Sequence, residues 1–317
     1  MTDSLQSELL SVFPQKQVLE NAPMSRYTTL RLGGPAQVLV EIASLEQLSA
    51  ALRIARQRQT PVTVLGNGSN LLVLDGGIDG LVVHIGSLFA HVSDPVSLPD
   101  GRVAITAQAG ASLQKLAGAA LTHGLTGLEF AAGIPGTVGG AAYMNAGAYG
   151  GEMKDVVSGV TLMNEKGEAM TFTNEEMAFA YRSSRLSQLP PPCAATSVTV
   201  CLTPGDPDAI RATMRDFAMR RKEKQPLSQP SCGSTFKRPQ GHFAGTLIDQ
   251  CGLKGARIGG ASVSTLHAGF LVNDRNGTAA DYLALIAHVQ NEVLRQTGVR
   301  LEPEVRVIGK ESPATAL

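Results

Sequence analysis

The sequence of 317 residues contains no tryptophan, and its 5 tyrosines and 9 phenylalanines leave few rings on which nucleobases could stack. A surplus of charge is missing too, because Lys and Arg together number 27 and so do Asp and Glu. A protein that binds a nucleic-acid backbone needs an excess of basic residues to replace counterions. We therefore expect no nucleic-acid partner.

Signals for export, membrane insertion and metal binding are also missing. The N-terminal stretch MTDSLQSELLSVFPQKQ has no basic region followed by an apolar one, so we expect no secretion signal. Residues 130–151 carry no charge, but Gly and Ala dominate them and Pro135 interrupts them, so we expect no membrane span. The cysteines form no CxxC pair and no zinc motif, which is typical of free thiols in a reducing cytoplasm: Cys193, Cys201, Cys232 and Cys251. We expect a cytoplasmic monomer that binds no metal.

Apolar residues suffice for a buried core, since 43% of the chain is hydrophobic and 17% is charged. Helical spacing of apolar residues predicts helices over 44–58, 112–123 and 281–296, and Asp206 before Pro207 predicts the start of another. In the first of these helices we expect Ser44 to be the N-cap and Leu45 to lie on the buried face, and in the last we expect Tyr282 to be a core residue. Apolar runs rich in β-branched residues predict short strands, at 61–65, 71–74, 81–85, 103–109, 156–163, 268–273 and 304–308. The fold class is therefore α+β.

The first segment that indicates chemistry is Gly66-Asn67-Gly68-Ser69-Asn70. It only half resembles a dinucleotide fingerprint, because Leu71 replaces the third glycine and a strand follows where a helix is needed. Consecutive small residues between two strands can instead aim their backbone N–H groups at an anion. A plain hairpin turn is the alternative at this point.

A second glycine-rich loop runs from Gly133 through Gly136 and Thr137 to Gly139 and Gly140. So many glycines are costly in conformational entropy, so the backbone must need them. Either the chain turns repeatedly at positive φ, or it packs closely, or a ligand such as a pyrophosphate or a flavin lies against the main chain. Two such loops in one half of the chain favour an extended ligand that contacts both.

A third segment, Ser231 to Lys237, contains the pattern Ser234-x-x-Lys237 of penicillin-binding proteins. The Lys-Thr-Gly and Ser-Asp-Asn motifs of those serine hydrolases do not occur in the chain. Cys232 has no evident partner base that would make it a nucleophile. A serine beside a lysine can also donate a proton from a fixed position.

Two distant pieces, Tyr181-Arg182 and the stretch from Leu301 to Arg306, carry charges that spacing alone cannot bring together. The six histidines form no cluster, so we interpret each as structural or exposed.

Seven segments, in this order, closely resemble the UDP-N-acetylenolpyruvoylglucosamine reductase (MurB) family over about residues 20–309: TTLRLGGPA, VLGNGSNLLV, EFAAGIPGTVGGAAYMNAGAYG, YRSS, GSTFKRP, LIDQCGLKG and LEPEVRVIG. The resemblance implies an FAD-binding unit of the vanillyl-alcohol-oxidase type in two subdomains, 1–85 and 86–205, and a substrate domain, 206–317. FAD would be bound without a covalent bond by the two glycine-rich loops, through Gly66, Asn67, Gly68, Ser69, Asn70, Gly133, Gly136, Thr137, Gly139 and Gly140.

The reaction that the resemblance implies is reduction of the enolpyruvyl ether of UDP-N-acetylglucosamine to UDP-N-acetylmuramate. This is a step of peptidoglycan precursor synthesis, and thus of cell-wall biogenesis, cell shape and division. NADPH would reduce the flavin and leave, and the reduced flavin would then pass hydride to the vinyl carbon. By motif match, Arg182 and Glu304 would stabilise the charge that develops, and Ser234 would donate the proton. Lys224 would contact the substrate diphosphate.

This chain departs from the family pattern at Arg238, where members often have Asn, and we assign Arg238 to substrate contacts. The short spacing between Arg182 and Ser234 resembles the branch that lacks a loop carrying a substrate-capping tyrosine. Other interpretations stay open: another oxidoreductase of the same FAD fold, such as an alcohol oxidase with covalent flavin, a non-catalytic FAD-fold protein, and an SxxK serine hydrolase.

Overall fold

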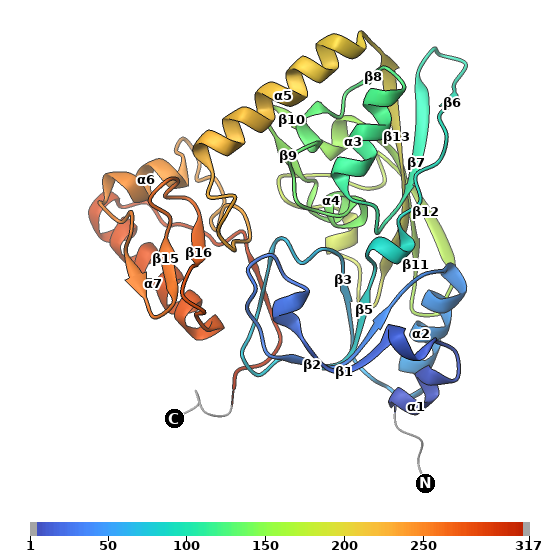
Figure 1. Ribbon diagram of the computed structural model, residues 1–317, viewed down its shortest axis with the longest axis horizontal. Helices are drawn as coiled ribbons and strands as arrows, with labels where there is room; N and C mark the ends of the chain where they lie inside the picture. The colour runs from blue at the N-terminus through green and yellow to red at the C-terminus, as the bar shows by residue number, and fades with distance from the viewer. Residues whose placement is uncertain (1–4, 313–317) are drawn as a thin grey trace. The chain divides into compact units, whose positions relative to one another are not determined.

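A computed structural model of the protein describes residues 5–312 (Figure 1). The described residues form two compact units that are interleaved along the sequence. Unit 1 contains the residues up to Glu20 together with Val38–Asn67 and Gly80–Arg220, and unit 2 contains Asn21–Gln37, Gly68–Asp79 and the residues from Arg221 onward. The helices are α1 (Leu5–Leu10), α2 (Leu45–Gln57), α3 (Leu113–Thr122), α4 (Val138–Met144), α5 (Pro207–Lys224), α6 (Ala244–Gln250) and α7 (Ala279–Thr297).

The larger sheet lies in unit 1. Its order is β12 (Ala169–Thr173), β11 (Val157–Met163), β13 (Ala194–Pro204), β7 (Val103–Gln108) and β6 (Val96–Ser97), and the short β8 (Leu125–Thr126) also pairs with β13. All of these pairs are antiparallel. Helix α4 packs against β13 and β7, and α3 packs against α4 (Figure 1). Leu113, Leu116 and Ala117 of α3 are buried in the core between these layers.

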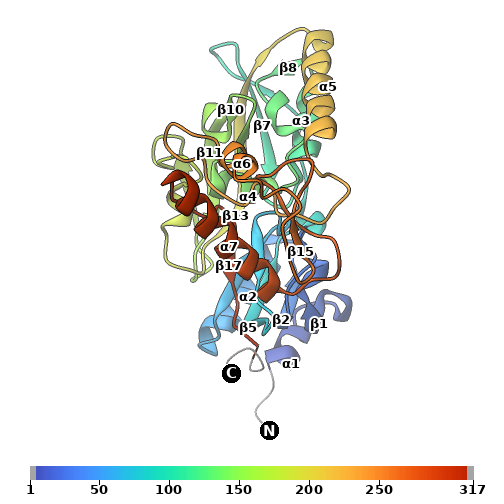
Figure 2. The same cartoon turned by 90° about the vertical axis from the view of Figure 1, so that its left-hand side faces the viewer.

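A second sheet joins β1 (Val18–Pro23), β2 (Pro35–Glu41), β5 (Ile78–His84) and β3 (Val62–Leu65) in that order. Strands β3 and β5 run parallel, and β4 lies between them in the sequence. The chain therefore returns to the same end of the sheet before β5 begins. Helices α1 and α2 lie together beside this sheet in both views (Figures 1 and 2). Ser44 caps α2 by accepting a hydrogen bond from the Gln47 N–H, which explains where the helix begins.

Unit 2 is built around α7, which packs against β14 (Arg257–Ile258) and β15 (Ala261–Val263); β15 pairs in turn with β16 (Leu271–Asn273) (Figure 1). A parallel pair, β4 (Leu71–Val73) and β17 (Arg306–Ile308), belongs to the same unit. The core includes Leu30, Leu32 and Leu72 from the N-terminal part of the chain. The motif TTLRLGGPA at 28–36 thus contributes to the unit that holds the C-terminal third.

The predicted mixture of helices and strands is confirmed, and the predicted elements occur within a few residues of their expected positions. One side chain was placed wrongly: Leu45 was expected on the buried face of α2, but it is 45% exposed. It is the first residue of the helix, where the apolar face is not yet covered. The predicted boundaries after residues 85 and 205 stay a prediction.

The start of α7 is held by a carboxylate from a distant segment of unit 2. The side chain of Asp75 accepts hydrogen bonds from the N–H groups of Ala279, at 2.8 Å, and Ala280, at 3.0 Å. Both donors belong to the first turn of the helix, where backbone N–H groups lack partners within the helix and negative charge is favoured. This contact joins the loop after β4 to the largest helix of the unit.

We expect Asp75→Ala to lower the free energy of unfolding of unit 2 by about 1–2 kcal/mol, since it removes two charge-assisted bonds to a helix start. Urea unfolding followed by circular dichroism measures the change. Asp79→Ala is the matched control, because Asp79 only pairs with Lys310 at the surface and should cost about 0.5 kcal/mol or less. Equal effects of the two substitutions would contradict the role given to Asp75.

Candidate active site

The first glycine-rich loop, 66–70, connects β3 to β4. The hairpin alternative is wrong here, because β3 pairs with β5 and β4 pairs with β17, so the two strands do not pair with each other. Gly68 has φ +58°, a conformation that disfavours other residues, and a Cβ there would lie 2.1 Å from the carbonyl oxygen of Tyr27. Gly68 is therefore needed for the turn by which the chain leaves the sheet of β3 and enters the sheet of β4.

Within unit 1, the beginning of this loop lies against the second glycine-rich loop. A Cβ on Gly66 would stand 2.4 Å from the Thr137 hydroxyl oxygen, so only glycine allows the approach. Next to it, the Asn67 side chain donates a hydrogen bond of 2.8 Å to the carbonyl of Pro135. The sequence predicted that one ligand would contact both loops, and in unit 1 the structure brings residues 66–67 and 135–137 together.

Backbone donors in the two loops differ in what they already bind. Among residues 5–312, no protein group accepts from the amides of Asn67, Gly68 and Ser69. In the second loop, by contrast, Gly139 donates to the carbonyl of Ala109 at 2.9 Å, and Gly140 donates to the Thr137 hydroxyl at 3.2 Å. In unit 1 the amide of Asn67 is thus available to an anion, and in unit 2 so are those of Gly68 and Ser69, whereas the amides of Gly139 and Gly140 serve the fold.

None of the glycines of the second loop needs an unusual dihedral angle, and close packing explains Gly139. Gly133, Gly136, Gly139 and Gly140 are absent from the positive-φ residues of the described chain. A Cβ on Gly139 would lie 2.7 Å from the Cβ of Ala109, so the missing side chain allows α4 to approach that segment. Thr137 begins α4 as its N-cap.

Helix α4 connects this loop to the turn that carries Arg182. The helix ends at Asn145, which is 1% exposed and has φ +43°. The Asn145 side-chain amide donates to the carbonyl of Ala180 at 3.1 Å and to Glu152 at 2.8 Å. Because seven helical residues rise only about 10 Å, the second glycine-rich loop and the Arg182 turn lie near the two ends of one short helix.

Arg182 lies at the tip of a tight turn. Ala180 and Ser183 exchange backbone hydrogen bonds of 3.0 and 3.1 Å, and Arg182 between them has φ +53°. A left-handed conformation costs a non-glycine residue about 1 kcal/mol or more and is common at functional sites. The guanidinium lies 5.2 Å from the centre of the Tyr181 ring. The sequence placed Arg182 at the site, but its conformation and its support by Asn145 were not predictable from spacing.

In unit 2, the backbone joins the segments that carry Ser234 and Glu304. Thr235, which follows Ser234, accepts a hydrogen bond of 2.8 Å from the Glu304 N–H. Two residues further along, Lys237 donates its N–H to the carbonyl of Glu302 at 2.8 Å. Ser234 is exposed and Glu304 is half-buried. Two residues that lie 70 positions apart are therefore neighbours, which the sequence could suggest only through the family resemblance.

Beneath Ser234 lies a buried polar network centred on the Tyr282 hydroxyl. Tyr282 is fully buried, and its hydroxyl lies 3.1 Å from the Thr235 hydroxyl and 3.2 Å from the Cys232 sulfur. The Thr235 hydroxyl also accepts from the Leu271 N–H at 3.2 Å. Burial raises the pKa of Cys232 to about 11, so its thiol is protonated near neutral pH and is no nucleophile. Sequence reasoning treated Tyr282 only as a core residue of its helix.

The remaining predicted residues are exposed parts of unit 2. Lys237 forms an ion pair with Glu302. We would not expect this ion pair if Lys237 acted as the base for the Ser234 hydroxyl, as in the serine-hydrolase alternative. Lys224 is the exposed last residue of α5, and the guanidinium of Arg238 lies 4.0 Å from the centre of the exposed Phe243 ring.

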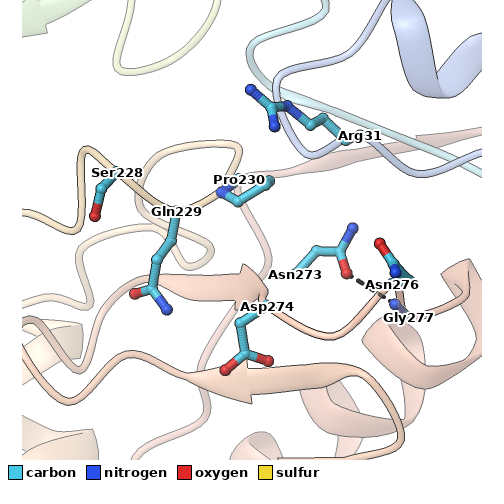
Figure 3. A pocket seen from close by; sticks show the side chains of 8 residues that line it. All are labelled: Arg31, Ser228, Gln229, Pro230, Asn273, Asp274, Asn276 and Gly277. Atoms are coloured by element: carbon cyan, nitrogen blue, oxygen red, sulfur yellow. Dashed lines mark hydrogen bonds between the residues drawn. The ribbon is translucent and has the colours of Figure 1, made fainter.

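A cavity of about 430 Å³ in unit 2 has a polar lining that includes none of the predicted site residues (Figure 3). Asn273 crosses its floor, donating to the carbonyl of Leu30 at 3.2 Å and accepting from the Gly277 N–H at 2.8 Å. The Asp274 carboxylate beside it pairs with Arg257 through two bonds, which lower its pKa. Of these polar groups, the Asn273 side chain connects β16 to the N-terminal segment at Leu30.

Among the residues that the structure describes, no group of three or more His, Cys, Asp or Glu side chains is placed to hold a metal ion. No helix in the described part of the chain is long and apolar enough to cross a membrane. The four cysteines are unpaired thiols.

Comparison with known proteins agrees with this geometry. Residues 36–173 match a family profile described as an FAD binding domain, and residues 225–308 match one described as the C-terminal domain of UDP-N-acetylenolpyruvoylglucosamine reductase. The reductase of Exiguobacterium sibiricum is 46% identical over 98% of this chain and all of its own length, and that of Limosilactobacillus fermentum is 47% identical over 96% of this chain and 98% of its own.

Among solved structures, the crystal structure of UDP-N-acetylenolpyruvylglucosamine reductase (MurB) from Thermus caldophilus is similar. It has 36% sequence identity and a TM-score of 0.77, and the match covers 92% of this chain and 98% of that one. The α+β fold, with an FAD-binding domain followed by a second domain, is thus confirmed. The chain belongs to the UDP-N-acetylenolpyruvoylglucosamine reductase (MurB) family.

Proposed function

We propose that this protein is an FAD- and NADPH-dependent oxidoreductase that reduces the enolpyruvyl ether of UDP-N-acetylglucosamine to UDP-N-acetylmuramate, a peptidoglycan precursor. The observation that carries the proposal is the hydrogen bond from the Glu304 N–H to the Thr235 carbonyl, which makes Ser234 and Glu304 neighbours. These residues stand in the segments that resemble the family. We infer that the substrate is bound as a small UDP-sugar by a monomeric cytoplasmic enzyme.

The residues of unit 1 fit an anionic cofactor. The amide of Asn67 has no protein acceptor in the described chain, and no side chain at Gly66 shields it. Such amides bind phosphate oxygens without a net positive charge. Gly66, Asn67, Gly133, Gly136, Thr137, Gly139 and Gly140 would hold FAD from unit 1, and Gly68, Ser69 and Asn70 continue the loop in unit 2.

FAD, when bound, supplies the hydride for the substrate alkene and regains it from NADPH. Reduction of an alkene that bears a carboxylate builds negative charge over that carboxylate and the adjoining carbon. Arg182 would oppose this charge, and Glu304 would donate a hydrogen bond to it when protonated. One donor that is aimed at such developing charge contributes about 3 kcal/mol to lowering the barrier. The tight turn fixes the backbone of Arg182 before the substrate arrives.

Ser234 would protonate the substrate carbon next to the one that receives hydride. A serine hydroxyl is a weak acid in water, but the carbanion is a much stronger base, so transfer from a well-placed hydroxyl is feasible. The network around Tyr282 and Thr235 holds the backbone that carries Ser234. Lys224 and Arg238 would bind the substrate diphosphate and its surroundings as exposed cations.

We expect Ser234→Ala to leave reduction of the bound flavin by NADPH at its normal rate and to slow turnover of the sugar nucleotide at least about 100-fold, as lost proton donation does. Anaerobic stopped-flow absorbance measures the two half-reactions separately. Ser97→Ala, on exposed β6, is the control and should change neither half-reaction. Normal turnover by Ser234→Ala would show that another group donates the proton.

We expect Gly66→Ala to raise the dissociation constant of FAD at least about tenfold, because its methyl group would meet the Thr137 hydroxyl at 2.4 Å and displace the loop. Flavin fluorescence titration of apoprotein measures the change. Gly118→Ala in α3 is the matched control, since a Cβ there has nothing within 4 Å and alanine favours a helix. An unchanged affinity in Gly66→Ala would remove this loop from the cofactor site.

We expect acid precipitation to release all of the flavin into the supernatant, because no covalent bond to the cofactor is proposed. Absorbance of pellet and supernatant at the flavin bands measures the distribution. A pellet that stays yellow would favour the alcohol-oxidase alternative. Bands that NADPH bleaches and the enolpyruvyl sugar nucleotide restores would exclude a non-catalytic flavin binder, and a stable adduct with a β-lactam would favour the serine hydrolase.

A further inference from the structure

A half-buried histidine that the proposed chemistry does not use lies beside the loop that is proposed to bind the cofactor in unit 1. His84 is the last residue of β5, which lies between β2 and β3 in the sheet. Its Nδ1 lies 3.5 Å from a carboxylate oxygen of Glu41, the last residue of β2. The parallel register of β5 with β3 pairs His84 with Leu65, so the ring lies beside the end of β3. A hydrogen bond with the backbone of Gly66, the residue that follows β3, raises the pKa of the imidazole, as a carbonyl acceptor does. The contact thus links three neighbouring strand ends.

The position of the ring is constrained by its surroundings. The His84 side chain is only 18% exposed. A Cβ on Gly86 would lie 2.7 Å from the His84 Cε1 atom, so the ring fills the space that a side chain at residue 86 would need. Burial lowers the pKa of His84, whereas Glu41 and the Gly66 carbonyl both favour the protonated ring. The protonated ring donates to both acceptors, whereas the neutral ring has one N–H and donates to the loop in the tautomer that carries the proton on the nitrogen facing Gly66.

Holding the Gly66 carbonyl also fixes the next amide. The carbonyl of Gly66 and the N–H of Asn67 belong to one planar trans peptide, so they point in opposite directions. A donor that holds the carbonyl on the β5 side therefore aims the Asn67 N–H away from the sheet. That N–H is one of the amides without a protein acceptor among the described residues.

We propose that His84, supported by Glu41, is a positioning residue for the cofactor: it holds the Gly66 carbonyl so that the Asn67 N–H is aimed at a phosphate oxygen of FAD. The inference rests on the proposed function only in that this loop binds FAD. Without the imidazole, the Gly66–Asn67 peptide can rotate, and the amide must be ordered again each time the cofactor binds.

The test compares FAD binding to apoprotein in variants at residue 84. We expect His84→Leu, which has no donor, to raise the dissociation constant of FAD about tenfold or more. His84→Gln should stay within about threefold of the unchanged protein, because its side-chain amide can still donate to the Gly66 carbonyl. His123→Leu is the matched control, since His123 is exposed beyond the end of α3 and should not affect binding.

Flavin fluorescence titration gives the affinities, and urea unfolding of each apoprotein shows whether it folds. Equal losses in His84→Leu and His84→Gln, or normal affinity in His84→Leu, would overturn the inference. If His84→Leu does not fold, Gly86→Ala decides, because its methyl group displaces the ring without removing it. Gly86→Ala should then weaken FAD binding, and unchanged affinity would overturn the inference. Failure of the unchanged protein to bind FAD would instead contradict the proposed function.

Discussion

The close approach of Gly66 to Thr137 is the contact on which the arrangement of unit 1 depends. It requires that residue 66 have no side chain, and it places the end of β3 against the start of α4. The Thr137 hydroxyl that limits this approach also accepts the Gly140 N–H and thereby begins the helix. From there α4 leads to Asn145, which holds the Arg182 turn. The absence of a side chain at residue 66 thus allows the loop after β3, helix α4 and the turn of Arg182 to be connected in this way.

Unit 2 depends in a similar way on one residue beside the proposed proton donor. Thr235 donates its N–H to Gly269, accepts the Glu304 N–H at its carbonyl, and binds Leu271 and Tyr282 through its hydroxyl. These partners come from three segments of the unit: the stretch with Gly269 and Leu271, helix α7 with Tyr282, and the stretch with Glu304. Because Thr235 is fully buried, breaking any one of its bonds would leave a polar group without water. Ser234 can therefore be exposed and still have a fixed backbone.

How much of the fold and of the candidate site could be predicted from the sequence depends on how far apart in the sequence the interacting residues lie. Helix α2 and its Ser44 cap follow from local spacing and were predicted to within a residue or two. The loop at 66–70 was recognised, but its partners were not, because β3 and β4 pair with strands far along the chain. The periodicity of apolar residues could not predict that the two units are interleaved, since Leu30 and Leu72 have the same pattern as other core residues. Glu41, His84 and Tyr282 gave no local signal, as their partners are set by strand order and burial.

The balance of charge in the chain is consistent with the anion sites that we propose in the two units. With 27 basic and 27 acidic residues, the protein has no overall field that would attract a phosphate group. In unit 1, recognition is assigned to backbone amides, whose direction is fixed by neighbouring carbonyl contacts and whose strength does not depend on net charge. In unit 2, it is assigned to exposed cations, which suit a substrate that must enter and leave. An amide that is aimed by a buried donor suits a cofactor that stays, because its ordering is completed when the protein folds.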